Sequence, residues 1–90
     1  MSPGRRLALV VVVLLALAAG QRLKSHRYLS GVKVFRLHPL DGPPRPIRRA
    51  TVESLCNQDL TDSNKKFPAA TYWLTEQGRH IVAALKAADR

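Results

Sequence analysis

The sequence is poor in cysteine, in aromatic residues and in acids. Its 90 residues include one Cys, one Trp, two Tyr and two Phe. A single Cys excludes an intrachain disulfide framework and a zinc site built from several cysteines. A chain of this length forms about one small domain, which excludes a two-domain enzyme and a full dinucleotide-binding fold.

The scarcity of acids gives the chain a strong positive charge. Six Asp and Glu stand against 15 Lys and Arg, a formal net charge of +9. Residues 1–40 contain seven of the cations and no acid, whereas residues 41–90 contain eight cations and all six acids. A basic segment of this kind favours an anionic membrane as the first partner and nucleic acid as the second, and a solvated basic surface without function is the third interpretation.

One uninterrupted apolar run is the strongest feature that is present. Residues 7–19 contain no polar side chain, and Arg5 and Arg6 precede them. As a helix this run rises about 20 Å, which is shorter than a bilayer core of about 30 Å. The length, the preceding arginines and the small residues up to Ala18 are typical of a signal peptide cleaved after Ala18.

Dense positive charge directly after the run opposes translocation, because cationic segments stay on the cytoplasmic side. The sequence therefore predicts a single-pass membrane protein with a cytoplasmic C-terminal part. Export after cleavage near Ala18 is the alternative, and a buried helix of a soluble fold is a third interpretation. The cations expected to flank the membrane are Arg5, Arg6, Arg22, Lys24 and Arg27.

Composition divides the chain into four segments. Residues 1–20 are a signal peptide or membrane-anchor helix, and residues 21–38 are a basic juxtamembrane segment that ends in a strand, predicted from alternating apolar residues. Residues 39–47 are a proline-rich linker. Residues 48–90 form a small α+β segment.

Within the last segment, a helix is predicted over residues 50–60, with Val52, Leu55 and Cys56 on one apolar face. A strand follows at 71–74, and Thr75 caps a C-terminal helix. We expect Cys56 to be buried and Trp73 to pack in the small core or to cover its edge.

Residues 51–85 resemble the wing and closing helix of bacterial winged-helix regulators. The resemblance rests on Tyr72-Trp73-Leu74-Thr75-Glu76-Gln77-Gly78-Arg79. It implies that the helix of residues 50–60 is a recognition helix and that the loop before the strand is a wing. The residues that would then contact nucleic acid are Arg48, Arg49, Thr51, Asn57, Gln58, Lys65 and Lys66.

No constellation of catalytic or metal-binding residues stands out. His26, His38 and His80 lie far apart in the sequence, and Ser54 and Ser63 lack the flanking signatures of nucleophiles. We therefore expect no enzyme activity, no cofactor and no metal.

The expected fold is α+β, with an N-terminal apolar helix followed by a small domain of two or three short strands and two helices. The expected function is that of a small basic membrane-associated binding or accessory protein without catalytic activity. The alternatives are a winged-helix-like DNA-binding protein of the transcriptional-regulator type and a small secreted protein released by signal cleavage. A protein partner or self-association is expected too, because so small a core is marginally stable alone.

Overall fold

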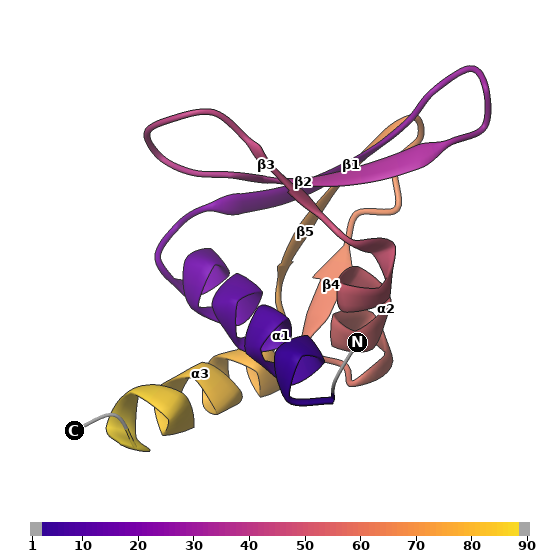
Figure 1. Cartoon of the computed structure of the whole chain (residues 1–90). Coiled ribbons are helices and arrows are strands. Elements are labelled where there is room, and N and C mark those ends of the chain that lie inside the picture. The colour runs from indigo at the N-terminus through magenta and orange to yellow at the C-terminus, as the bar shows by residue number, and fades with distance from the viewer. Residues whose placement is uncertain (1–2, 89–90) are drawn as a thin grey trace.

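The computed structural model describes residues 3–88 and the side chains of residues 8–88. Five strands form one antiparallel sheet in the order β3-β2-β1-β5-β4. The helices of the described chain lie together on one face of this sheet, which makes a two-layer α+β architecture (Figure 1). The elements are α1 (Pro3–Ala18), β1 (Arg22–Arg27), β2 (Lys33–His38), β3 (Arg45–Ile47), α2 (Arg49–Asn57), β4 (Thr61–Ser63), β5 (Ala69–Leu74) and α3 (Glu76–Ala88).

Helix α1 ends at a glycine that turns the chain toward the sheet. Gly20 has a φ of +97°, and its N–H donates to the carbonyl of Leu17 at 3.1 Å. The next N–H, that of Gln21, donates to the carbonyl of Ala16, also at 3.1 Å. This pair of bonds is the Schellman arrangement, which satisfies the last carbonyls of a helix and favours glycine at the left-handed position.

Strand β1 is the centre of the sheet. Leu23 lies opposite Leu37 of β2 on one side and opposite Tyr72 of β5 on the other. Because successive side chains of a strand alternate between faces, Leu23 and Ser25 point toward the helices while Arg22, Lys24 and His26 point away. The edge strands β3 and β4 have three residues each, and Pro46 in β3 limits pairing with another chain.

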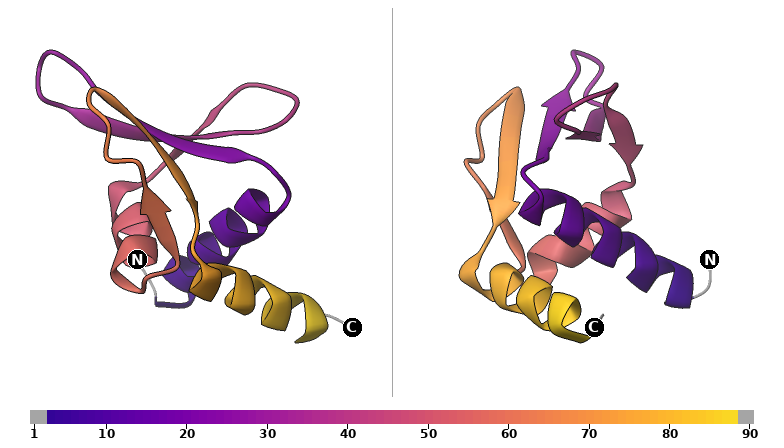
Figure 2. Two further views of the ribbon diagram at one scale, coloured as in Figure 1. Left: turned by 180° about the vertical axis from the view of Figure 1, so that it is seen from behind. Right: turned by 90° about the vertical axis from the view of Figure 1, so that its left-hand side faces the viewer.

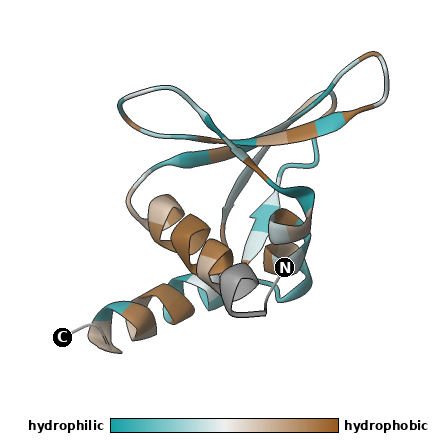
Figure 3. Cartoon of the chain, viewed as in Figure 1, coloured by the Kyte–Doolittle hydropathy of each residue, from teal (hydrophilic) through white to brown (hydrophobic). Residues whose placement is uncertain are grey.

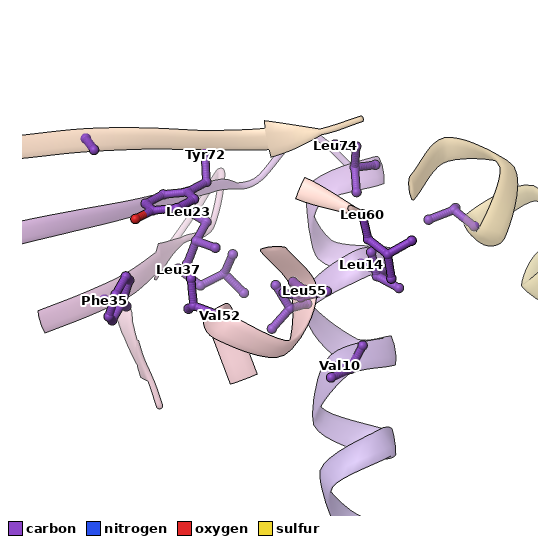
Figure 4. Close-up of a cluster of buried hydrophobic side chains, with 13 residues drawn as sticks. Val10, Leu14, Leu23, Phe35, Leu37, Val52, Leu55, Leu60, Tyr72 and Leu74 are labelled. Carbon is purple, nitrogen blue, oxygen red and sulfur yellow. The ribbon is translucent and has the colours of Figure 1, made fainter. Parts of the chain in front are cut away.

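The core lies between the inner face of the sheet and helices α1 and α2 (Figure 4). Side chains from both helices meet those of the central strands, and burial of this apolar surface is the main stabilising term. The fully buried side chains of the described residues, with a relative exposure below 2%, are Leu14, Leu23, Leu37, Leu55, Val13 and Val52.

Helix α3 packs against the end of the sheet through a glycine. The Thr75 hydroxyl accepts a hydrogen bond from the Gly78 N–H at 3.0 Å, which confirms Thr75 as the helix cap. At Gly78, a Cβ would lie 2.1 Å from the carbonyl oxygen of Leu60. Only glycine therefore lets α3 approach the start of β4 this closely.

The fold expected from the sequence is wrong in its strand content and in the place of the first helix. The domain has five strands instead of two or three, and α1 belongs to it as a third helix. The additional strands β1, β3 and β4 carry mostly polar residues, so their hydrophobic alternation is weak. Pairing with neighbouring strands fixes them as strands.

The predicted single-pass membrane localisation is contradicted. In the part of the chain that the structure describes, no helix combines the length and the hydropathy needed to cross a bilayer. The apolar run forms α1, whose side chains Val10, Val13 and Leu14 are 5%, 1% and 1% exposed in the core. The alternative of export with cleavage near Ala18 rested on the same run, which here is part of the folded core.

Two smaller predictions also fail. Cys56 is exposed, because the buried positions of α2 are Thr51, Val52 and Leu55, which turns the Cys56 side of the helix outward. Trp73 is 44% exposed, because Tyr72 and Leu74 take the inward positions of β5 and alternation places Trp73 on the other face.

The burial of α1 predicts a large loss of stability when Leu14 is truncated. Leu14→Ala should lower the free energy of unfolding by about 2–5 kcal/mol, because it removes a core side chain and leaves a cavity. Urea denaturation followed by circular dichroism measures the change. Val12→Ala is the control: Val12 lies on the outward side of the same helix at 45% exposure, so its truncation should have little effect. Equal losses in the two variants would contradict the packing of α1.

The contact at Gly78 reverses the usual effect of alanine in a helix. Gly→Ala normally stabilises a helix interior by about 1 kcal/mol. Here Gly78→Ala should destabilise the protein by about 1–3 kcal/mol, because the methyl group collides with a backbone carbonyl. Thermal unfolding measures this, with Gln77→Ala at the adjacent exposed position as a near-neutral control. An unchanged or higher Tm for Gly78→Ala would show that α3 does not pack this closely.

Candidate functional site

The face of the sheet opposite the helices has no helix over it (Figure 2). We call this surface the open face. It is formed by the outward residues of the three longest strands, β1, β2 and β5. These residues are Arg22, Lys24, His26, Val34, Arg36, His38, Ala69, Thr71 and Trp73.

The strand register brings the cations of the open face together at its centre. Lys24 of β1 lies directly opposite Arg36 of β2 and, on its other side, opposite Thr71 of β5. Arg22 lies opposite His38 in the next outward row. Adjacent strands are about 4.7–4.9 Å apart, so that Lys24 and Arg36 are like charges in neighbouring positions. Two like charges in opposite positions destabilise a sheet. Such a locally unfavourable pair is typical of a functional surface.

Aromatic rings lie at both ends of this basic centre. Trp73, at the C-terminal end of β5, is 44% exposed, and Tyr28, just beyond β1, is 43% exposed. The Arg36 guanidinium donates to the Tyr28 hydroxyl at 3.2 Å. The His26 ring meets the Tyr28 ring edge-on, with 4.8 Å between centroids. These contacts hold Tyr28 in place beside the cations.

Acidic side chains are absent from the nine positions of the open face. The nearest carboxylate by register is that of Asp62, which lies opposite Trp73 on the edge strand β4. Its carboxylate accepts a hydrogen bond from the Ser63 N–H at 2.8 Å. Among the described residues, Arg22, Lys24 and Arg36 form no ion pair with a carboxylate.

Two shallow clefts hollow the open face and its margin. One, of about 220 Å³, lies over the central strands and is lined by the basic and imidazole side chains of β1 and β2. The other, of about 480 Å³, lies where α1 meets β1 and β5 and includes Arg22, Trp73 and Arg79. Both clefts are open to solvent and combine cationic groups with ring surfaces.

The cations predicted to flank a membrane lie mainly in the sheet. Arg22 and Lys24 belong to the open face, whereas Arg27 is half-buried at the end of β1, where its guanidinium donates to the Gly31 carbonyl at 2.7 Å. Arg5 and Arg6 belong to the first turns of α1, and their side chains lie outside the described part of the structure.

The residues implied by the winged-helix resemblance are divided among several places. On α2, Arg48 precedes the helix, Arg49 pairs with Glu53 at 3.3 Å, and Thr51 is buried in the core. Asn57 and Gln58 lie at the other end of the helix.

The remaining two residues of that set, Lys65 and Lys66, lie in the exposed β4–β5 loop. The Gln58 amide donates to the Ser54 carbonyl and hydroxyl at 3.2 and 2.9 Å, so it is occupied within the helix. The structure thus does not gather the whole set on one surface.

Sequence reasoning missed four members of the open face, namely His26, Arg36, His38 and Trp73. Of these, only His26 lies in residues 22–27, where it shares one face of the strand with Arg22 and Lys24. Interpreting that segment as a basic flank of a membrane helix concealed its strand period of two.

The chemistry available to these residues is binding through charge and ring stacking. Among residues 3–88 no group of three or more His, Cys, Asp or Glu side chains is placed to hold a metal ion. Comparisons with protein-family models, curated proteins and solved structures gave no match. The resemblance to winged-helix regulators therefore stays a prediction.

The like-charge pair of Lys24 and Arg36 predicts that removal of one charge stabilises the protein. Lys24→Gln should raise the free energy of unfolding by about 0.2–1 kcal/mol, because it removes repulsion from Arg36. Thermal unfolding at low and high salt measures this, and the gain should shrink at high salt, where exposed charges are screened. Lys86→Gln removes the same charge from the last turn of α3, where a cation is favourable, and should not raise stability. A loss of stability in Lys24→Gln would contradict the proximity of the two cations.

Proposed function

We propose that this chain is a binding protein without catalytic activity that holds single-stranded nucleic acid on the open face. The observation that carries the proposal is a surface on the three longest strands that has no acid, with clustered cations at its centre and an exposed aromatic ring at each end. Each of these components has a role in binding a flexible polyanion.

The cations supply the attraction for phosphates. Arg22, Lys24 and Arg36 form two adjacent rows on neighbouring strands, and binding a phosphate chain replaces their mutual repulsion with attraction. Neutralisation of phosphates also releases counterions, which makes such binding strongly dependent on salt. The net charge of +9 favours rapid encounter with a polyanion.

The aromatic rings favour single strands over duplexes. Trp73 and Tyr28 present ring surface on a broad sheet, and unpaired bases are free to stack on such rings. In a duplex the bases are already stacked on one another, and a sheet surface does not enter a groove. By analogy, open antiparallel sheets that carry aromatic and basic residues are a recurrent platform for single-stranded RNA.

Two other functions proposed from the sequence, membrane binding and duplex DNA binding, require surfaces of a different kind. An anionic membrane surface calls for apolar side chains beside the cations, and the large aliphatic residue of the open face is Val34, which is half-buried. A winged-helix interface would use α2 and the β4–β5 loop to bind duplex DNA. Both functions enter the test below as alternative outcomes.

Binding to a fluorescent oligouridylate of about 12 nucleotides tests the proposal. The wild-type protein should bind it, with affinity falling steeply as salt rises, and Trp73, as the single tryptophan, should change its fluorescence on stacking. Trp73→Ala should weaken binding by about 1–3 kcal/mol, and Trp73→Phe should retain most of the affinity. Lys24→Gln should reduce the slope of log affinity against log salt by about 0.7.

Matched controls separate the open face from total charge. Lys86→Gln removes one charge on α3, away from the open face, and should leave the affinity for oligouridylate nearly unchanged. Binding that is insensitive to Trp73→Ala and Lys24→Gln would refute the proposal. Preference for duplex DNA together with sensitivity to Lys65→Gln and Lys66→Gln would favour the winged-helix function, and binding only to anionic vesicles would favour the membrane surface.

A further inference from the structure

A second recess lies on the helix side of the sheet, away from the open face. The helices do not cover the end of the sheet where β1 turns into β2, so the inner face is open there (Figure 1). The β4–β5 loop closes the other side of this space and leaves a cleft of about 550 Å³. We call it the inner cleft. Its volume lies within the range of pockets that take small organic ligands.

The floor of the inner cleft is polar where a core would be apolar. Two of the three buried polar residues of the described chain, Ser25 and Thr61, lie in it at 3% exposure each, and the Tyr72 side chain lines it as well. The Thr61 hydroxyl contacts the Cys56 sulfur at 3.4 Å. The floor therefore presents hydroxyl groups to the space above it.

The Ser25 hydroxyl is the most informative of these groups. Every fully enclosed side-chain nitrogen or oxygen of the described structure has a hydrogen-bond partner. The Ser25 hydroxyl has no partner among the described residues, so its oxygen must be open to the inner cleft. A hydroxyl that is bound to no other side chain or backbone group is free to hydrogen-bond a ligand that enters the cleft, in place of water.

Cations surround the inner cleft. Arg27 and Lys33 come from the β1–β2 hairpin, and Lys65 and Lys66 come from the β4–β5 loop. Lys33 Nζ lies 5.3 Å from the centroid of the Phe35 ring, which orients its stem.

Two carboxylates and one ring complete the lining. Asp59 and Asp62 also line the inner cleft, but the four cations outnumber these two carboxylates, so the formal charge around the cleft is positive. At its mouth the Phe67 ring is 78% exposed. The inner cleft thus combines donors for an anion with a free aromatic surface.

We propose that the inner cleft binds a phosphate monoester of mononucleotide size. The phosphate takes hydrogen bonds from the Ser25 hydroxyl and charge from the surrounding lysines and Arg27, and a base stacks on Phe67. The ligand is either a free mononucleotide or the phosphorylated end of a strand, since both present the same chemistry. This site is separate from the open face and does not depend on the function proposed for it.

Isothermal titration calorimetry with adenosine 5′-monophosphate tests the site on the full chain. The nucleotide should bind the wild-type protein, and adenosine should bind at least tenfold more weakly, because it lacks the charged hydrogen-bond acceptor. Ser25→Ala should lower the affinity for the nucleotide several-fold without lowering the Tm of the free protein, because the lost hydroxyl has no partner in the free chain. Lys65→Gln and Lys66→Gln should weaken binding as well.

The controls distinguish the inner cleft from the open face. Lys24→Gln, on the open face, should leave nucleotide binding unchanged, and Ser25→Ala should leave binding of unphosphorylated oligouridylate unchanged, so each proposal fails or stands alone. If Ser25→Ala weakens binding of an oligouridylate that carries a 5′-phosphate, the ligand is a strand end. If Ser25→Ala weakens binding of the mononucleotide alone, the ligand is the free compound. No binding of the nucleotide at millimolar concentration, or equal affinity for adenosine, would overturn the inference.

Discussion

The packing of α1 on the inner face of the sheet is the interaction on which the rest of the structure depends. This helix supplies Val10, Val13 and Leu14 to the core, where they meet residues of β1, α2 and α3. Hydropathy along the chain is highest in this helix, while much of the sheet is polar (Figure 3). Without α1, the inner face would lose much of its apolar cover, and the remaining domain would be too small to hold five strands together.

Covering one side of the sheet leaves the other side free to carry charge. Because β1 lies between β2 and β5, its alternation decides what both surfaces present: Leu23 and Ser25 inward, Arg22 and Lys24 outward. The same strand thus contributes to the core, to the open face and, through Ser25, to the inner cleft. Its neighbours fix the register, and a shift by one residue would place cations in the core.

Parts of this fold were predictable from local pattern. The alternation around Phe35 and Leu37 identified β2, the residues before Thr75 identified β5, and the Thr75 cap located the start of α3. These elements carry their own apolar period or cap. Strands β3 and β4 are three residues long, and β3 contains a proline, so neither has a sequence period long enough to recognise.

The candidate site was harder to predict because tertiary pairing assembles it. Arg22 and Lys24 were identified as functional cations, but on a membrane flank, because an apolar run of this length fits a signal core and a buried helix equally well. Arg36 becomes a partner of Lys24 only through the β1–β2 register. Trp73 becomes exposed only because its neighbours Tyr72 and Leu74 face the core. No local signal contains these facts.

The pairing of β1 with β5 has a consequence for folding during synthesis on the ribosome. Leu23 and Tyr72 lie opposite each other on neighbouring strands but are separated by about half of the chain. At translation rates of about 5–20 residues per second, α1 is complete several seconds before β5 and α3 exist to enclose it. During that interval the nascent chain displays an apolar helix with nothing to cover it. The apolar face of α1 is therefore fully enclosed only after the C-terminal strand and helix have been synthesised.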